Sequence, residues 1–378
     1  MASPIVLHVL EALGGGTARH LLDTVRHTPD VRHEVAVPRR RVGWLSDDSA
    51  FVELERAGAV VHAVEMRRAP WHPRNVSALA RLAALMRERR PALVHGHSSL
   101  GGALARTAAW PLGVPRIYTP NGIATAARAV LLERSLGRIT DRLVAVSESE
   151  AALVRRLRLV PDERLVVVPN GVNPDDPLGA PSFDVRERLG LPADTPLVGC
   201  LARLVAQKAP DVFVAACARA GARLPDAHFV LFGNGGVLAR TVEAEIACSG
   251  LDDRFHDLRD PERPASLLSQ FEVMVSTSRF EGAPYTPLDA IQAGTVLVLS
   301  DVVGNRDVIE DGVSGLLVPV DDPSATADAI VRLIRDPALR GSLAEAARLR
   351  LRARFDVRVS GRALLDVYLG LLSDTGPP

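Results

Sequence analysis

Residues 279–294, reading RFEGAPYTPLDAIQAG, hold the side chains of this sequence best suited to chemistry. Two acids lie here, Glu281 and Asp289. The residues between them include small and hydroxylated types, namely Gly282, Ala283, Pro284, Tyr285 and Thr286. A strand-like run, 273–277, comes before and a helical pattern, 287–293, comes after, so backbone N–H groups at the positive helix end would suit a phosphate. The acids could hold sugar hydroxyls by charge-assisted hydrogen bonds, although an ordinary turn with two solvated acids has the same pattern.

A second candidate pair, Arg203 and Lys208, follows a strand-like run at 197–201 and precedes a helix expected from Pro210. Of the 45 lysine and arginine residues, only Lys208 is a lysine. A surface lysine could be exchanged freely in such an arginine-rich chain. The one that remains is expected to place a compact charge in a tight phosphate site, unless it is a chance survivor.

Glycine-rich segments follow two further predicted strands. Gly14, Gly15 and Gly16 come after the strand 5–10 and before a helix expected over 18–26. Gly233 and Asn234 come after the strand 229–232. Both turns would let backbone approach a ligand such as a diphosphate. The first lacks the G-x-G-x-x-G spacing and an acid at the end of the next strand, so a nicotinamide dinucleotide is not indicated.

Polar residues also end predicted strands in the first half of the chain. His97 closes the strand 91–97, at the edge where open α/β sheets bind ligands, although a lone histidine is often structural. Ser98 opens the next helix, and Asn121 and Gly122 turn away from the strand 116–119.

The composition limits the classes of protein to which this chain can belong. A chain of 378 residues with zero formal net charge suggests two domains and gives no sign of a nucleic-acid partner. Its three cysteines form no disulfide framework and no metal spacing, which predicts a reduced, cytoplasmic setting without a metal. The opening residues are read as a strand rather than a signal peptide, and no apolar run is long enough to span a membrane.

Strands alternate with helices in two successive runs. We therefore predict an α/β architecture of two doubly wound, mostly parallel sheets that face each other. The expected domains are 1–172 and 173–355, with a linker at 173–182 and a last helix, within 356–378, that crosses back to the first domain. The predicted strands are 5–10, 33–37, 60–64, 91–97, 116–119, 143–146, 165–168, 197–201, 229–232, 255–258, 273–277, 296–299 and 316–318.

Taken together, the segments around 203–208, 233–235 and 278–294 resemble the donor half of a retaining glycosyltransferase of family 4, the glycogen-synthase-like group. The first half of the chain is similar to the same family, in order, through LEALGGGTARHLL, VHGHSS, YTPNG, AVSESE and VVPNGV. The resemblance covers nearly the whole chain. It implies the GT-B fold, in which two Rossmann-like domains enclose a cleft that holds an N-terminal acceptor site and a C-terminal donor site.

The resemblance also implies residue roles. Arg203 and Lys208 would clamp the donor diphosphate without a metal, and Glu281 would face the transferred sugar. His97 would lie near the reacting face of that sugar and is the fourth expected catalytic residue. Donor contacts are expected from Gly15, Gly16, Gly233, Asn234, Leu258, Gly282, Ala283, Pro284, Tyr285, Thr286 and Asp289. Acceptor contacts are expected from Ser98, Asn121 and Gly122.

Three positions depart from the family pattern. Asp289 is one methylene shorter than the usual glutamate, which would lengthen ribose contacts. Asn121 replaces a histidine, which removes a titratable group near the acceptor. Ala209 replaces the glycine that usually follows the lysine. None of these changes removes the cationic clamp or Glu281, so activity is expected.

The implied reaction moves a hexosyl or N-acetylhexosaminyl group from a nucleotide-diphosphate sugar, expected to be UDP-linked, to a hydroxyl, with retention. A catalytically silent relative that binds a nucleotide sugar or supports a partner enzyme is the alternative. A sugar epimerase or a phosphorylase shares the architecture, but a glycogen-type phosphorylase needs a pyridoxal-binding lysine and Lys208 is the single lysine.

Only the chemical class of the acceptor can be inferred from the sequence. The loops 39–50, 66–75 and 122–132 would shape its pocket, and the arginine- and alanine-rich composition suggests a high-GC bacterium. A small natural product or a lipid-linked sugar fits equally well. Basic tracts at 39–41 and 67–68 would allow weak contact with an anionic membrane surface. The sequence indicates no oligomeric state.

Overall fold

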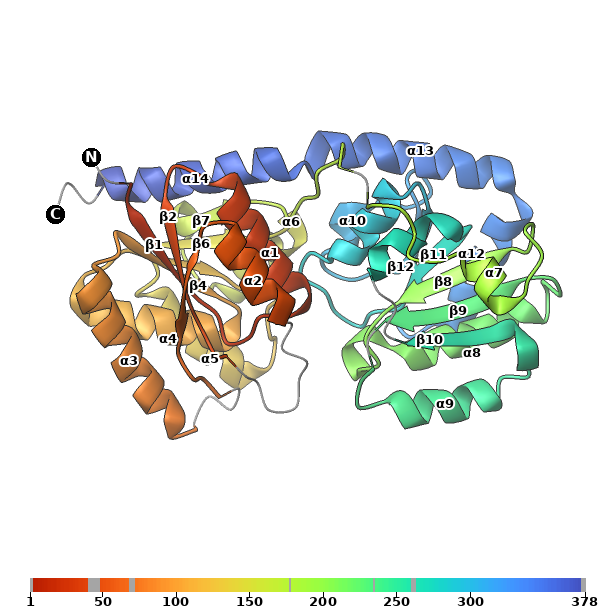
Figure 1. The fold of residues 1–378 in the computed structure, drawn as a ribbon, viewed down its shortest axis with the longest axis horizontal. Coiled ribbons are helices and arrows are strands. Elements are labelled where there is room, and N and C mark those ends of the chain that lie inside the picture. Colours follow the sequence, from red (N-terminus) through yellow and green to blue (C-terminus); the bar gives the residue numbers. More distant parts are fainter. Residues whose placement is uncertain are drawn as a thin grey trace. The chain divides into compact units, whose positions relative to one another are not determined.

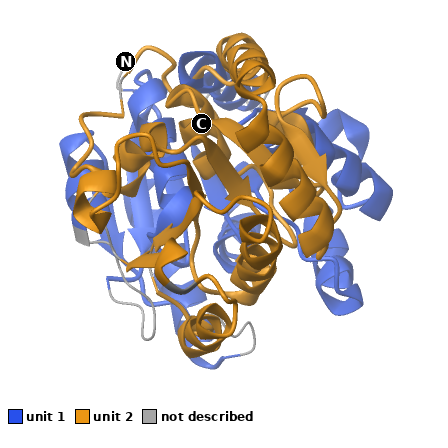
Figure 2. Ribbon diagram, turned by 90° about the vertical axis from the view of Figure 1, so that its right-hand side faces the viewer, with its two compact units in different colours: residues 1–170, 357–378 blue, residues 171–356 orange. Residues whose placement is uncertain are grey.

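The computed structural model describes residues 3–39, 48–67, 72–176, 178–233, 235–259 and 263–374. The chain divides into two compact units, one of residues 1–170 and 357–378 and the other of residues 171–356 (Figure 2). These limits lie within two residues of the predicted domain boundaries. The predicted last helix belongs to unit 1.

Within the described part of unit 1, seven strands form one parallel sheet in the order β3-β2-β1-β4-β5-β6-β7 (Figure 1). Most are buried apolar runs, as expected for a sheet covered on both faces. Their bounds are β1 Ile5–Val9, β2 Arg32–Val37, β3 Val60–Ala63, β4 Leu93–His97, β5 Arg116–Thr119, β6 Arg142–Ala145 and β7 Leu165–Val167.

Helices connect and cover these strands, as parallel pairing requires. They are α1 Gly15–His27, α2 Asp48–Arg56, α3 Arg74–Arg89, α4 Ser99–Ala109, α5 Ala127–Gly137, α6 Glu148–Leu157 and α14 Val357–Asp374. The short 3-10 turns are Trp110–Leu112 and Asp162–Arg164.

The described part of unit 2 holds a six-stranded parallel sheet in the order β10-β9-β8-β11-β12-β13. Its strands are β8 Leu197–Leu201, β9 His228–Gly233, β10 Phe255–Arg259, β11 Val273–Ser276, β12 Val296–Ser300 and β13 Leu316–Val318. Its helices are α7 Val185–Leu189, α8 Pro210–Gly221, α9 Ala239–Ala247, α10 Tyr285–Gln292, α11 Asn305–Val308, α12 Pro323–Arg335 and α13 Pro337–Arg354. Its 3-10 turns are Ala206–Lys208, Asp252–Arg254 and Pro264–Gln270.

Helix α14 returns to unit 1 by a close approach. Leu364, Tyr368 and Leu371 join the buried cluster that contains Val6 and Ile117. A Cβ atom on Gly361 would lie 2.3 Å from the Cβ of His27 in α1, so only glycine fits this helix contact. The hydroxyl of Tyr368 also forms a 2.7 Å hydrogen bond with Nδ1 of buried His95.

The predicted fold class of two doubly wound Rossmann-like sheets is confirmed, with every predicted strand present. The predicted start of the first helix at residue 18 is wrong, because α1 begins at Gly15 and includes the glycines in its first turn. Helices α2, α5, α7, α9 and α11 were not predicted. Among the described helices, none combines the length and the apolar character needed to cross a bilayer.

Candidate active site

The chemically promising residues of unit 2 gather where the order of its strands reverses. β8 and β11 are neighbours there, with Val198 beside Val273. Arg203 and Lys208 follow β8, and Glu281 follows β11. Loops after the carboxyl ends of two such strands form the usual ligand-binding edge of an open α/β sheet. The topology therefore brings these candidates to one place.

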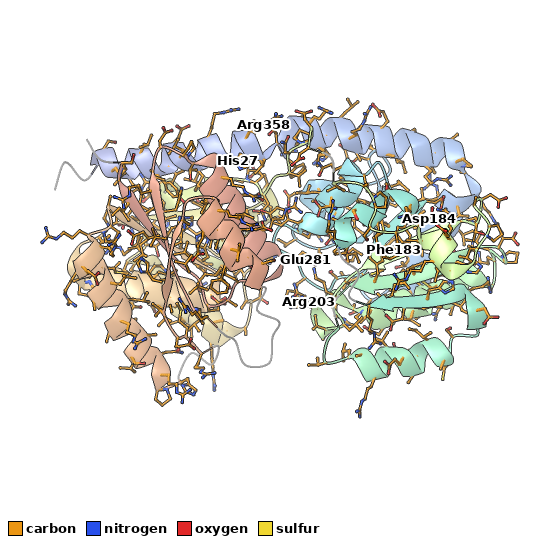
Figure 3. All side chains as sticks on the ribbon, in the orientation of Figure 1. His27, Phe183, Asp184, Arg203, Glu281 and Arg358 are labelled. Carbon is orange, nitrogen blue, oxygen red and sulfur yellow. The ribbon has the colours of Figure 1, made fainter. Side chains whose placement is uncertain are left out.

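Lys208 and Glu281 form a direct ion pair, 2.5 Å from Nζ to Oε1. The lysine side chain is 21% exposed and the glutamate side chain is 7% exposed. Glu281 and Arg203, both labelled in Figure 3, come from the two loops described above. A partly exposed cation paired with a largely buried acid can exchange this mutual bond for bonds to a ligand's phosphate and hydroxyls.

Arg279 fastens the two loops together. Its guanidinium donates to Asp211 at 2.6 Å, to Asp321 at 2.7 Å and to the carbonyl oxygen of Ala206 at 2.9 Å. The hydrogen bonds to Asp211 are the largest cause that raises the pKa of Arg279. This arginine was not a predicted site residue. It holds the segment before Lys208 in register with the segment before Glu281.

The residue after the lysine has an unusual backbone. Ala209 is fully buried and has φ 46° and ψ 54°, the left-handed region that favours glycine. The hydroxyl of Thr277 donates to its carbonyl oxygen at 2.8 Å and supports this conformation. The substitution noted in the sequence is therefore accommodated in the conformation that a glycine would adopt.

The glycines at the end of β9 and just after it have a packing role. A Cβ atom on Gly233, whose φ is 129°, would lie 2.7 Å from the carbonyl oxygen of Ala202. A Cβ atom on Gly236 would lie 2.2 Å from that of Leu204. These contacts press the loop against the backbone on both sides of Arg203. Asn234, a predicted donor contact, lies outside the described residues.

The loop that precedes α10 packs against the loop that contains Gly304. A Cβ atom on Gly304 would lie 2.4 Å from the carbonyl oxygen of Gly282, so the two loops touch through backbone. Pro284 is the N-cap residue of α10 and Tyr285 its first residue, which places Thr286 in the first turn.

Other predicted donor contacts vary in exposure. Asp289 is 5% exposed and Tyr285 is 7% exposed, so both side chains are buried in unit 2. Ala283 and Thr286 are half-buried. Leu258, in β10, is half-buried against a hydrophobic cluster of that unit. A cavity of about 340 Å³ in the same unit is lined by none of the predicted site residues.

Unit 1 has its own strand-order reversal, between β1 and β4. His97 ends β4 and is fully buried. Glu11, which follows β1, accepts hydrogen bonds from Ser98 Oγ at 2.8 Å and from the Gly101 N–H at 2.9 Å. The sequence analysis missed Glu11, although its place after the first strand was a usable signal. The hydroxyl proton of Ser98, a predicted acceptor contact, is directed to Glu11.

The predicted turn after β5 is held by an acid. Gly122 donates its N–H to Glu150 at 2.7 Å, and Asn121 has φ 54° in the left-handed region. The Nδ2 atom of Asn121 is buried without a hydrogen-bond partner in the described structure. Gly15 and Gly16 open α1, where the first N–H groups of a helix lack intrahelical partners.

His97 belongs to a cluster of five histidines in the core of unit 1. Each of these side chains is at most 8% exposed. The members are His8, His20, His33, His95 and His97. Burial is the largest cause that lowers the pKa of every one of them. One ring nitrogen from each of His8, His95 and His97 lies within 4.8 Å of the other two, so these three rings could ligate a metal ion. Both nitrogens of His8 and both of His95 are already hydrogen-bonded.

Family comparisons agree with this geometry. Residues 14–176 match the model described as Glycosyltransferase Family 4, and residues 195–336 match the model described as Glycosyl transferases group 1. The first match falls mainly on unit 1, and the second lies within unit 2.

Curated relatives carry glycosyltransferase names. A D-inositol 3-phosphate glycosyltransferase of Thermobispora bispora is 30% identical, over 94% of this chain and 89% of that protein. An alpha-D-kanosaminyltransferase of Streptomyces kanamyceticus is 30% identical over 62% of each chain.

Solved structures share the fold. HepE of Anabaena, crystallised with UDP and glucose, superimposes with a TM-score of 0.83 at 18% identity, covering 97% of this chain and 100% of that one. The sucrose-phosphate synthase of Thermosynechococcus elongatus gives 0.79 at 20% identity, over 99% and 100%. With matching models on both units and a relative similar over almost its whole length, the chain belongs to glycosyltransferase family 4 and is a glycosyltransferase of the GT-B fold.

Proposed function

We propose that this enzyme transfers a hexosyl or N-acetylhexosaminyl group from a UDP-linked sugar to a hydroxyl of a small-molecule or glycolipid acceptor, with retention and without a metal. The observation that carries the proposal is the Lys208–Glu281 pair at the strand-order reversal of unit 2. It supplies a cation for a phosphate and an acid for sugar hydroxyls at one ligand-binding edge.

The donor assignment draws on position and on relatives. HepE of Anabaena was crystallised with UDP and with glucose, which supports a UDP-sugar here. Arg203 and Lys208 would neutralise the departing diphosphate, a task that a metal performs in other enzymes. Gly15 and Gly16, in unit 1, open α1, and the first N–H groups of that helix suit a phosphate of a ligand.

The chemistry is a single group transfer. The bond between the anomeric carbon and the diphosphate oxygen breaks, and the acceptor oxygen forms the new glycosidic bond. The departing phosphate oxygen takes the acceptor proton from the same face of the sugar, which gives retention. Arg203 and Lys208 act where negative charge develops, so they lower the barrier more than they strengthen ground-state binding.

The acceptor class is argued from the relatives' names. One is named for an inositol phosphate and another for an aminosugar transfer, so a polyol or cyclitol hydroxyl is a reasonable acceptor. Ser98, Asn121 and Gly122 would line its side of the site. Part of the predicted acceptor region, residues 40–47 and 68–71, lies outside the described residues.

Thermal-shift and calorimetric titration with UDP, GDP, ADP and their glucose and N-acetylglucosamine esters, in the presence of EDTA, tests the donor. A ligand at about a hundred times its dissociation constant stabilises the native state by about 2.7 kcal/mol. We expect stabilisation by UDP, changed further by one UDP-sugar. Binding that requires a divalent cation would contradict the metal-free clamp.

Product analysis separates catalysis from binding. The donor identified above is incubated with inositol phosphate and with aminocyclitol acceptors, and the anomeric configuration of the product is read by NMR. A product with the donor's configuration is expected. An enzyme that binds the donor tightly but transfers to none of these hydroxyls, and does not hydrolyse it, would favour the catalytically silent alternative.

A further inference from the structure

A chain of hydrogen bonds runs through the buried histidines of unit 1 and has a fixed direction. It starts at Thr28, whose hydroxyl donates to the carbonyl oxygen of Thr24 at 2.7 Å. With its proton used there, the Thr28 hydroxyl oxygen can only accept. His33 Nε2 lies 3.0 Å from that oxygen and 3.1 Å from the Thr28 carbonyl oxygen. Both neighbours are acceptors, so Nε2 of His33 carries the proton.

The direction then passes along the rings. A neutral His33 with its proton on Nε2 has a lone pair on Nδ1, which lies 3.0 Å from Nε2 of His8. His8 must therefore donate from Nε2, which leaves a lone pair on its Nδ1. That atom lies 3.0 Å from Nε2 of His97. His97 in turn must donate from Nε2 and keep a lone pair on Nδ1.

The last atom of this chain has no partner among the described residues. Nδ1 of His97 is buried and makes no hydrogen bond there. We propose that Thr28, His33 and His8 are positioning residues that hold His97 as the Nε2–H tautomer, so that its bare Nδ1 accepts a hydrogen bond from a substrate hydroxyl. The identity of the substrate rests on the function proposed above; the tautomer does not.

Neutral rings are required for this argument, and their environment provides them. Burial, followed by repulsion from neighbouring histidines, lowers the pKa of His8, and burial followed by His20 lowers that of His97. Burial also lowers the pKa of His33. At neutral pH each of the three rings therefore carries a single proton, and its position follows from the partners alone.

A second ring beside His97 repeats the arrangement. Nδ1 of His20 donates to Oδ1 of Asn170 at 2.9 Å, so the lone pair of His20 is on Nε2, which is also buried without a partner among the described residues. The His20 and His97 rings lie edge to face with centroids 5.5 Å apart. Two neighbouring acceptors suit a ligand group that donates protons, such as a sugar hydroxyl, and disfavour a carboxylate or phosphate oxygen.

The tautomer can be measured without any substrate. Protein labelled with ¹⁵N at the histidine rings is recorded at neutral pH, and His97 is assigned by the signals lost in His97→Gln. The wild-type His97 is expected to show a protonated Nε2 and an unprotonated Nδ1. A protonated Nδ1 on His97 in the wild-type protein would overturn the proposal.

Two replacements of one residue test the relay. His33→Leu removes the acceptor for His8, so the His8 proton should move to Nδ1 and the His97 tautomer should invert. His33→Asn offers an amide oxygen near the former Nδ1 position and should restore the wild-type pattern. An unchanged His97 signal in His33→Leu would show that the relay does not set the tautomer.

Kinetics then connect the tautomer to turnover. We expect His33→Leu to lower kcat by about tenfold or more, because a proton on Nδ1 of His97 removes the acceptor that orients the substrate hydroxyl, with UDP affinity unchanged and His33→Asn largely rescued. If the tautomer inverts without loss of turnover, Nδ1 has no role toward substrate. If neither wild-type nor variant transfers sugar while the tautomers behave as expected, the proposed function fails and the relay stands.

Discussion

Single residues in this site depend on partners that were not part of the sequence pattern. Lys208 and Glu281 were each predicted to meet the donor, and the structure shows that they also meet each other. Because the Glu281 side chain is only 7% exposed, loss of the lysine leaves a poorly solvated carboxylate. Stability and activity are therefore coupled at this pair.

A double-mutant cycle separates the effect of this ion pair on stability from its effect on activity. Lys208→Met should lower the unfolding free energy by about 2 kcal/mol, because the charge of Glu281 loses its ion-pair partner. Adding Glu281→Gln should recover most of that stability, since no charge remains to be desolvated. Sugar transfer should stay at least about 100-fold reduced in both single variants and the double variant.

Urea unfolding and initial-rate assays on the four proteins provide the data. Arg348→Met serves as the control, because Arg348 and its partner Glu345 are both 52% exposed and a surface ion pair of this kind contributes little to stability. Restored transfer in the double variant would show that neither side chain has a role in the reaction.

Residues with a recognisable chemical signature could be predicted, and residues with a supporting task could not. The solitude of Lys208 marked it in the sequence. Arg279 looked like any surface arginine, and its three anchors come from segments distant in sequence. Gly233 was predicted to let backbone approach a ligand, and the close approach that the structure shows is to the Ala202 carbonyl oxygen. Such partners follow only from tertiary packing.

At the level of secondary-structure elements, strands were easier to predict than helices. Buried parallel strands are short continuous apolar runs, such as 197–201 and 296–299, and they stand out from their surroundings. The unpredicted helix α9 buries only Val242 among its described side chains, so it has little apolar periodicity to detect. Helix α1 begins three residues early because Gly14 serves as its N-cap.

Two glycines of α14 give a matched test of helix packing. Gly361→Ala would bring a methyl group to 2.3 Å from the His27 side chain and 2.7 Å from its carbonyl oxygen. We expect a loss of about 1–3 kcal/mol of unfolding free energy, because α14 must move away from α1. Gly370, with open space around it, is the control.

Gly370→Ala should change stability in the opposite direction, with a gain of up to about 1 kcal/mol from helix propensity. Chemical denaturation of both variants beside the wild type gives the comparison. Equal effects of the two substitutions would mean that the contact between α14 and α1 does not restrict position 361.

At the level of the whole molecule, the chain enters unit 2 near residue 170 and leaves it near residue 356. The GT-B fold could be predicted because both halves repeat the same strand–helix alternation. The substrates could not, because relatives at the same 30% identity are named for different transfers. The histidine cluster of unit 1 could not be predicted either. Its members are spread over some 90 residues of sequence and come together only in the folded core.

That core makes stability depend on pH in a defined direction. All five buried histidines have a folded-state pKa below the unfolded value of about 6.5, and that of His20 falls to about 4. The unfolded chain therefore binds more protons between these values. The stability is fully present above about pH 6.5 and is lost as the pH falls toward 4.

Thermal unfolding measured from pH 8 to pH 5 should reveal this uptake. Each such histidine contributes a slope of about 1.4 kcal/mol per pH unit below its unfolded pKa, so the melting temperature should fall steeply below about pH 6. His20→Asn should remove the contribution of one histidine from the pH dependence of the unfolding free energy. A melting temperature that stays constant from pH 7 to pH 5 would contradict neutral burial of the cluster.

The single lysine has a consequence for chemical labelling. An amine-selective reagent finds one side-chain target in this sequence, and that target is Lys208, the partly exposed partner of Glu281. Reductive methylation with a ¹³C-labelled aldehyde would therefore install one spectroscopic reporter per chain in the candidate donor site, apart from the amino terminus. A protease that cleaves only after lysine would likewise cut at one place, on the loop between β8 and α8.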